Sequence, residues 1–481
     1  MFNLKAIALV GGLIICSIGF LLFIPLIIEV VFQTDNWQAY AVPILIYTIV
    51  GGALVIVNKE EDMNIKLKDA FVITVLSWIL VTVLSAVPFI YAQTKLSVVD
   101  SLFESISGLT TTGATVLTNL DNLPMGILFW RALLQWLGGI GIIVIALFIF
   151  PFLKLGGMQL FHLEGDDPYE KHLPKISAVV KKILLLYGLF TFLLIVLYFI
   201  NGMSLFDAIA HSFTTISTGG FSTHDQSFAY FQSTPLMFIS IIFMIVGSLP
   251  FLILTQFNLQ NWVIFKDSQI RLFFLILLIT IVAIYILANS YLEGSFIDQI
   301  VTIAFNSISI ISGTGYVSDN FENWGNYASV LFLLLMFIGG CAGSTTGGIK
   351  IFRFLILFKH IAVHLNKMLK PHSIISSQFN GKTIQDYTFE SVMNFFFIYI
   401  FTFAMAALLL SFSGLDFLTC ISAAASAISN VGPGLGELIG PEGNYSQLTD
   451  FAKLVLSCTM LVGRLEMLTI FILLLPSFWK N

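Results

Sequence analysis

The chain has 481 residues and a net charge of −5, and 10% of its residues are charged against 57% that are hydrophobic. A soluble domain carries ~25% charged residues, and a chain of this length cannot bury so much apolar surface. The composition excludes a soluble enzyme, a nucleic-acid-binding protein and a disordered scaffold. It predicts an all-α polytopic membrane protein that contacts the lipid bilayer and no nucleic acid.

Ten apolar stretches are long enough to cross a membrane, which takes about 20 residues of helix. The first follows Lys5 and has no cleavage site of small residues, so we expect a retained helix and not a signal peptide. The eighth is too long for one span and is interrupted near its middle. In chain order the stretches are 6–32, 40–57, 70–91, 127–153, 183–200, 235–256, 272–288, 329–363, 391–412 and 454–476.

The last eight stretches form four pairs, and each pair encloses a connection that ends in Gly, Ser and Thr. Each connection has an acidic residue, then a helix-compatible stretch, then a glycine. Because this pattern recurs roughly every hundred residues, it predicts four helix–re-entrant hairpin–helix units. The acids are Asp100, Asp207, Asp298 and Asp416, and the glycines are Gly113, Gly219, Gly315 and Gly432.

This repeat predicts the organisation of the chain. Two N-terminal transmembrane helices occupy 1–60, and the pore repeats occupy 68–155, 177–258, 269–366 and 388–478, the third with an intramembrane loop at 339–348. Non-helical backbone at membrane depth is tolerated where it is buried in protein or lines a water-filled cavity. One Gly-rich segment would more often be a packing surface, but four in register favour convergence on a central pore.

Backbone carbonyls of four converging hairpins can replace the hydration shell of a cation. Glycine allows the strained backbone that this requires, and the short helices would direct their negative C-terminal ends at the ion. Neutral oxygen ligands favour an alkali cation over a transition metal. The predicted ion-binding residues are Thr111, Thr112, Gly113, Thr218, Gly219, Gly220, Thr314, Gly315, Asn430, Val431 and Gly432.

The distribution of charge predicts the orientation. The segments 92–126, 201–234, 289–328 and 413–450 contain one basic residue, Lys95, against thirteen acidic residues, whereas the other loops are rich in lysine. Because cytoplasmic loops are enriched in Lys and Arg, we expect the hairpins to face outward and both termini to be cytoplasmic. We also expect His211 and His224 to be structural or mouth residues, and Arg131 to snorkel at an outer span end.

The hairpins resemble a known family. Thr110-Thr111-Thr112-Gly113, Ser217-Thr218-Gly219-Gly220, Gly313-Thr314-Gly315-Tyr316 and Asn430-Val431-Gly432-Pro433-Gly434 resemble the four filter segments of the Trk/Ktr/HKT superfamily of potassium transporters. The segments 339–350 and 463–466 resemble two further signatures. The extra N-terminal helices and Phe161-His162-Leu163-Glu164-Gly165 indicate the TrkH branch.

The resemblance implies more than the residues do alone. It implies K+ as the transported ion, no organic cofactor in this chain, a bacterial inner-membrane location and a homodimer with one pore per subunit. It also implies a cytoplasmic nucleotide-binding regulatory ring of the TrkA type. A serine at the first filter glycine is associated in the family with sodium permeation, so Gly113 favours potassium selectivity.

The interruption at 339–348 is predicted to be a gate. It is rich in Gly, Ser and Thr, which are poor helix formers, and its backbone must find partners in protein or water. A charge near mid-span is costly, so we expect Arg464 to reach the carbonyls or hydroxyls of the loop. The alternative is a packing kink with Arg464 in a structural ion pair. The predicted gate residues are Gly343, Ser344, Thr345, Thr346, Gly347, Gly348, Lys350, Arg464 and Glu466.

The predicted function is potassium uptake through a carbonyl-lined filter, gated by this loop and by a soluble partner. The partner is expected to dock on the cytoplasmic segments 58–69, 154–182 and 365–387. The alternative within transport is a symporter that couples potassium to protons or sodium. A membrane-embedded enzyme is disfavoured, because the sequence of the spans has no nucleophile–base or metal-ligand pattern.

Overall fold

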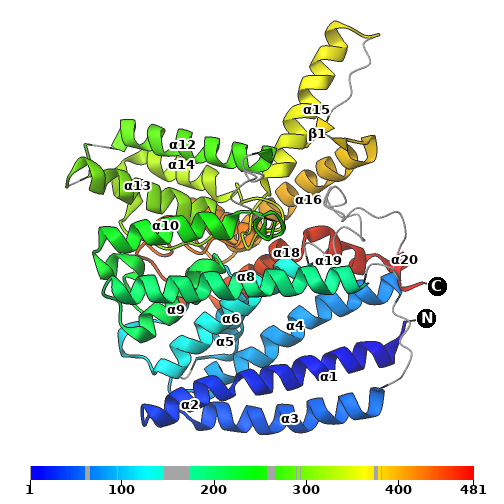
Figure 1. Ribbon diagram of the computed structural model, residues 1–481, viewed down its shortest axis with the longest axis vertical. Coiled ribbons are helices and arrows are strands. Elements are labelled where there is room, and N and C mark those ends of the chain that lie inside the picture. Colours follow the sequence, from blue (N-terminus) through cyan, green and yellow to red (C-terminus); the bar gives the residue numbers. More distant parts are fainter. Residues whose placement is uncertain are drawn as a thin grey trace.

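The computed structural model describes residues 2–59, 66–94, 96–145, 173–256, 266–288, 290–292, 294–372, 378–380 and 382–480. In these ranges the secondary-structure elements are all helices, apart from a small antiparallel hairpin of β1 (Gln378–Phe379) and β2 (Lys382–Thr383). Seven of the described helices are long and apolar enough to cross a membrane, or eight if a bent pair forms one span. The prediction of an all-α polytopic membrane protein is confirmed. Both termini lie at the same end of the molecule (Figure 1).

The N-terminal helices form a hairpin beside the rest of the bundle (Figure 1). They are α1 (Leu4–Leu21), α2 (Phe23–Val31) and α3 (Gln38–Asn58), so the predicted span 6–32 is interrupted at Leu22. Glycines bring α1 and α3 together: a Cβ on Gly51 would lie 2.6 Å from Cys16 Sγ. The buried Glu29 connects the hairpin to the bundle, because its Oε1 accepts a 2.9 Å hydrogen bond from Gly126 N.

The other predicted spans are helical, and three of them are broken. The stretch 235–256 changes helix at Leu249–Pro250, 329–363 is interrupted over 337–350, and 454–476 bends by 109° after Arg464. The end of 127–153, from residue 146, lies outside the described residues. These helices are α4 (Leu67–Tyr91), α6 (Met125–Val144), α8 (Leu173–Ile200), α10 (Thr234–Ser248), α11 (Phe251–Leu254), α12 (Ser268–Ala288), α14 (Asn326–Met336), α15 (Ile351–Leu369), α16 (Asp386–Ser411), α18 (Asp450–Arg464), α19 (Met467–Leu474) and α20 (Pro476–Trp479).

Each of the four connections begins with a short helix. These are α5 (Val98–Leu109), α9 (Leu205–Ile216), α13 (Phe296–Ile311) and α17 (Phe417–Ser429). The repeated acids mark their first turns. Asp100, Asp207 and Asp298 each follow a serine cap by three residues, and Asp416 is itself the cap and accepts from Thr419 N. Capping satisfies free N–H groups, and the negative charge complements the helix dipole.

Short 3-10 helices follow the four short α-helices on the way back to the next span. They are η1 (Leu120–Asn122), η4 (Ser227–Phe231), η6 (Phe321–Trp324) and η7 (Tyr445–Gln447).

The short helices are packed in a closed cyclic order. Each one contacts the two long helices that flank it in sequence and one helix of the preceding unit. Thus α5 contacts α4, α6 and α18; α9 contacts α8, α10 and α6; α13 contacts α12, α14 and α10; and α17 contacts α16, α18 and α14. This order brings the C-terminal ends of all four short helices toward one another, and the segments that follow them form the site.

Candidate functional site

The backbone turns in the same way after each short helix. A residue in the left-handed region is followed, two positions later, by a glycine with positive φ. The first positions are Thr111, Thr218, Gly313 and Asn430, with φ of +54°, +51°, +71° and +55°, and the second are Gly113, Gly220, Gly315 and Gly432, with φ of +85°, +76°, +76° and +108°. The equivalence that we predicted for Gly219 is therefore wrong by one residue, because the Gly219–Gly220 pair fits either register.

The four segments contact one another in a ring. A Cβ on Gly113 would lie 2.3 Å from Gly219 O, and one on Gly220 would lie 1.7 Å from Thr314 O. A Cβ on Gly315 would lie 1.9 Å from Val431 O, and one on Gly432 would lie 2.7 Å from Thr112 O. Each oxygen belongs to the residue that precedes the glycine of the next segment. Both the positive φ and the lack of space therefore require glycine at these four positions.

The four glycines line one cavity of about 80 Å³. Arg131, His224 and Asp225 line the same cavity. The structure thus brings the predicted ion-binding segments together, and the other predicted residues are buried in the segments beside these lining glycines. Thr111, Thr112, Thr218, Thr314, Asn430 and Val431 are all at most 1% exposed.

Side chains hold the segments from behind. Asn430 Nδ2 donates to Thr112 Oγ1 and to Met460 O, both at 3.0 Å, and so links the fourth segment to the first. The Tyr445 hydroxyl donates to Gly432 O at 2.8 Å. These contacts fix the backbone of the ring through hydrogen bonds that are buried and therefore costly to break.

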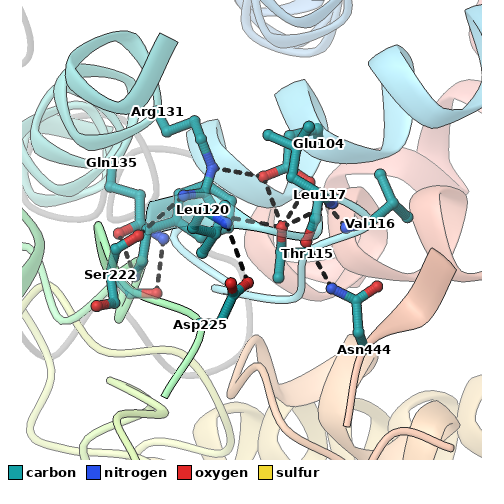
Figure 2. A network of polar contacts seen from close by, with 12 residues as sticks. Glu104, Thr115, Val116, Leu117, Leu120, Arg131, Gln135, Ser222, Asp225 and Asn444 are labelled. Atoms are coloured by element: carbon teal, nitrogen blue, oxygen red, sulfur yellow. Dashed lines mark hydrogen bonds and ion pairs between the residues drawn. The ribbon is translucent and has the colours of Figure 1, made fainter. Parts of the chain in front are cut away.

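Arg131 of α6 connects the first and second segments (Figure 2). Its Nε donates to Glu104 Oε1 at 2.7 Å, its Nη1 to Ser222 O at 2.9 Å and its Nη2 to Thr115 Oγ1 at 3.1 Å. The guanidinium also lies 4.1 Å from the centroid of the Phe221 ring. Arg131 is 1% exposed, so the expectation that it snorkels is wrong: Glu104 on the neighbouring short helix neutralises it inside the protein.

Gln135 lies one turn below Arg131 on α6 and contacts the second segment twice. Its Nε2 donates to Gly219 O at 2.6 Å, and its Oε1 accepts from Phe221 N at 3.0 Å. Neither Gln135 nor the Arg131–Glu104 pair was predicted from the sequence. Two polar residues four positions apart in an otherwise apolar span were the available signal, since such residues face one side of a helix.

His224 lines the cavity and forms a polar cluster at its mouth. Its Nδ1 lies 2.5 Å from Asp121 Oδ1 and its Nε2 lies 3.4 Å from Asp207 Oδ1. The ring stacks on Tyr230 with centroids 3.5 Å apart. Burial opposes protonation of His224, but the hydrogen bonds and charges of Asp207 and Asp121 outweigh it, so the pKa is raised above 6.5.

The loop between α14 and α15 packs against the other side of the ring segments. Thr345 Oγ1 donates to Gly247 O at 2.9 Å and accepts from Thr218 Oγ1 at 3.0 Å. A Cβ on Gly347 would lie 2.1 Å from Ser429 O, and one on Gly313 would lie 3.5 Å from Gly347 N. The loop therefore touches the second, third and fourth segments.

Buried charges surround this loop. Arg464 Nη2 donates to Thr345 O at 2.9 Å, which is the contact expected from the sequence. Lys350 Nζ donates to Thr346 Oγ1 at 2.9 Å. Glu466 does not pair with Arg464 but with Arg353, 2.6 Å away, and its own φ is +54°. Such a backbone is costly for a residue with a side chain, so strain is concentrated at the bend between α18 and α19.

The fold and the ring define a class: a membrane protein in which four unequal pore-loop units in one chain enclose a common site. The family model TrkH, described as a cation transport protein, matches residues 37–480. The chain belongs to the TrkH family, as the resemblance of its hairpins implied.

Relatives cover the whole chain. It is 39% identical over 460 residues to the Trk system potassium uptake protein TrkI of Halomonas elongata. The matched region covers 95% of this chain and 93% of that protein. It is 34% identical over 487 residues to TrkH of Escherichia coli, with 100% of both chains covered. The crystal structure of the potassium transporter TrkH from Vibrio parahaemolyticus matches with a TM-score of 0.91 at 33% identity over 100% of both chains.

The cluster at the mouth predicts a pH-dependent stability. Because the pKa of His224 is raised in the folded state, its ion pairs stabilise the protein fully below the unfolded value of about 6.5. This contribution is lost as the pH rises through the folded value. We expect wild type to melt at a higher temperature than His224→Gln under mildly acidic conditions, and the two melting temperatures to converge as the pH is raised.

The measurement is thermal unfolding of the purified protein across that pH range. The exposed His372 provides the control, since a His372→Gln variant removes a histidine far from the mouth. A difference between wild type and His224→Gln that does not change with pH contradicts the prediction.

Proposed function

We propose that this protein carries potassium across the bacterial inner membrane through the ring of Gly113, Gly220, Gly315 and Gly432. The observation that carries the proposal is the cyclic approach of each glycine to a carbonyl oxygen of the next segment. Four backbones held in this way offer neutral oxygens around one cavity, and such oxygens replace the hydration shell of an alkali cation. The relatives named above are potassium uptake proteins.

The proposed ion ligands are the residues predicted from the sequence. They are Thr111, Thr112, Gly113, Thr218, Gly219, Gly220, Thr314, Gly315, Asn430, Val431 and Gly432. Backbone carbonyls suit this role better than the threonine hydroxyls, several of which are engaged elsewhere. Thr112 Oγ1, for example, contacts both Thr110 Oγ1 and Asn430 Nδ2. Among the described residues there is no cluster of His, Cys, Asp and Glu able to hold a metal ion.

Flux measurements test this function. Purified protein in liposomes is expected to move potassium in the direction of its own gradient, whatever the proton and sodium gradients are. Movement of protons or sodium in fixed proportion to potassium would support the alternative, a symporter. Absence of potassium flux in every condition, with the regulatory partner present, would contradict the proposal.

The substitution Gly113→Ser tests whether the ring determines the preference for potassium over sodium. In Gly113→Ser the new Cβ would lie 2.3 Å from Gly219 O at a φ of +85°, so the ring must shift. We expect the preference for potassium over sodium to fall about tenfold, which corresponds to about 1.4 kcal/mol in relative ion binding. The measurement is the ratio of potassium to sodium flux in liposomes.

Gly414→Ser is the matched control for this substitution. Gly414 has a similar φ of +75°, but nothing lies within 4 Å of a Cβ built on it. It therefore carries the backbone strain without displacing a neighbour. Equal effects of Gly113→Ser and Gly414→Ser on the flux ratio, or no effect of either, would sink the assignment of the ring.

The gate in this proposal is the loop of Gly343, Ser344, Thr345, Thr346, Gly347 and Gly348, together with Lys350, Arg464 and Glu466. Three facts support it: the loop touches three of the four ring segments, Arg464 binds Thr345 O, and Glu466 binds Arg353 of the helix that follows the loop. Arg464 holds the loop across the ion path and adds a positive barrier to cations. The alternative is that the loop is a packing kink.

The proposed assembly is a homodimer in the inner membrane, with both termini in the cytoplasm and a TrkA-like nucleotide-binding ring as regulator. Docking of the regulator is proposed on 58–69, 154–182 and 365–387, of which 60–65, 154–172, 373–377 and 381 lie outside the described residues. The supporting feature is α15, which projects from the body of the molecule and is exposed from His364 to Lys370 (Figure 1). The division into two N-terminal helices (1–60) and four pore repeats (68–155, 177–258, 269–366, 388–478) belongs to the same proposal.

Basal flux without the regulator tests the gate. Arg464→Ala removes the contact to Thr345 O and the positive charge, and deletion of 343–347 removes the loop. Both are expected to raise potassium flux in liposomes that contain no regulator. Arg464→Gln loses the charge but keeps an amide donor. It therefore separates the effect of the hydrogen bond to Thr345 O from the effect of the positive charge. If Arg464→Ala and the deletion both fold and conduct as wild type does, the loop is not the gate.

A further inference from the structure

One contact between the ring segments differs from the other three. Each of Thr112, Gly219, Thr314 and Val431 offers its carbonyl oxygen to the glycine of a neighbouring segment. Among the described residues, the only one of these four oxygens that also accepts a hydrogen bond is Gly219 O, and its donor is Gln135 Nε2 at 2.6 Å. The ring is therefore chemically unequal at the contact between its first and second segments.

Gln135 holds the backbone on both sides of Gly220. Its amide nitrogen binds the carbonyl before this glycine, and its amide oxygen binds the N–H after it, Phe221 N, at 3.0 Å. Gly220 has a φ of +76° and lies against Thr314 O. Two contacts that flank one residue fix its φ and ψ more tightly than either contact alone, so Gln135 determines where Gly220 stands in the ring.

Gln135 is itself fixed in place. It is completely buried on α6, and it stands on the same face as three other residues that touch the segments. Arg131, one turn above it, binds Ser222 O; Gly138 lies against Leu109 O, and Gly139 lies against Ser217 Cβ. Figure 2 shows the Arg131 and Gln135 side chains pointing from this helix toward the loops. One face of α6 thus sets the position of the second segment relative to the first.

We infer that Gln135 is a positioning residue for ion selectivity. Its two amide hydrogen bonds, one on each side of Gly220, fix the Gly219 carbonyl at the contact between the first and second segments. The partial positive charge of the donated N–H also lies beside that oxygen, so the oxygen presents a weaker field to an ion than the other three do. The inference rests on the proposed function, because it assigns to Gln135 a part in the selectivity of that same ring.

The test compares two substitutions of Gln135 in full-length protein reconstituted into liposomes. Gln135→Met has nearly the same shape and loses both hydrogen bonds. Gln135→Glu keeps an acceptor for Phe221 N and regains a donor for Gly219 O when its carboxyl group is protonated. Thr191→Val is the control: it removes a part-buried 3.1 Å hydrogen bond that Trp136 Nε1 of α6 donates to Thr191, a residue without contact to the ring.

We expect Gln135→Met to lower the ratio of potassium to sodium flux about tenfold while potassium flux persists, as the loss of a buried hydrogen bond suggests. Thr191→Val is expected to keep the wild-type ratio. The ratio of Gln135→Glu, measured relative to wild type at each pH, is expected to approach the wild-type value as the pH falls. That of Gln135→Met is expected to stay low. A purely structural role would not produce this recovery on acidification.

Three results would overturn the inference. The first is a wild-type flux ratio in Gln135→Met. The second is failure of both Gln135 variants to fold while Thr191→Val folds, which would show a role in folding and not in selectivity. The third is absence of potassium flux in the wild-type protein, which would overturn the proposed function itself. The first two leave that function standing, so the two failures are distinguishable.

Discussion

The structure depends on one steric constraint: four backbone segments meet so closely that no side chain fits between a glycine and the next carbonyl. A Cβ built on Gly113, Gly220, Gly315 or Gly432 would lie between 1.7 and 2.7 Å from the carbonyl oxygen of the next segment, well below a van der Waals contact. Short capped helices bring the segments to this distance, and long helices behind them hold the short ones in cyclic order. A displaced segment would change the ring at two contacts at once, because each segment touches two neighbours.

A ring formed by one chain can be braced differently at each contact. Gln135 binds the second segment, Tyr445 binds Gly432 O, and Asn430 joins the fourth segment to the first. A homotetramer would repeat one bracing residue four times. Here the four units have separate surroundings, so a single substitution removes the support of one segment and leaves the supports of the other three in place.

The sequence predicted what repeats, and it did not predict what occurs once. The four hairpins and the acids at the start of each short helix were visible, because capping and glycine requirements act through local sequence. The register at Gly219–Gly220 was not, since two adjacent glycines satisfy the same pattern. Long-range partners were also hidden: Arg131 meets Glu104 across two helices, and Arg353 meets Glu466 from a distant part of the chain. Arg464 was the exception, because the cost of a mid-span charge demanded a partner and the loop was the nearest polar segment.

The buried cations differ in how completely they are satisfied. Arg131 and Arg353 each have a carboxylate partner, at 2.7 and 2.6 Å. In the described part of the protein Arg464 has no carboxylate partner; it makes one hydrogen bond there, to Thr345 O, and its Nε and Nη1 have no partner. An uncompensated charge in the membrane is costly and persists where it faces a polar path. Arg464 is also next to the strained bend at Glu466. In the proposed gate, release of Arg464 would break one hydrogen bond and no ion pair among the described residues, and the adjoining backbone is already strained.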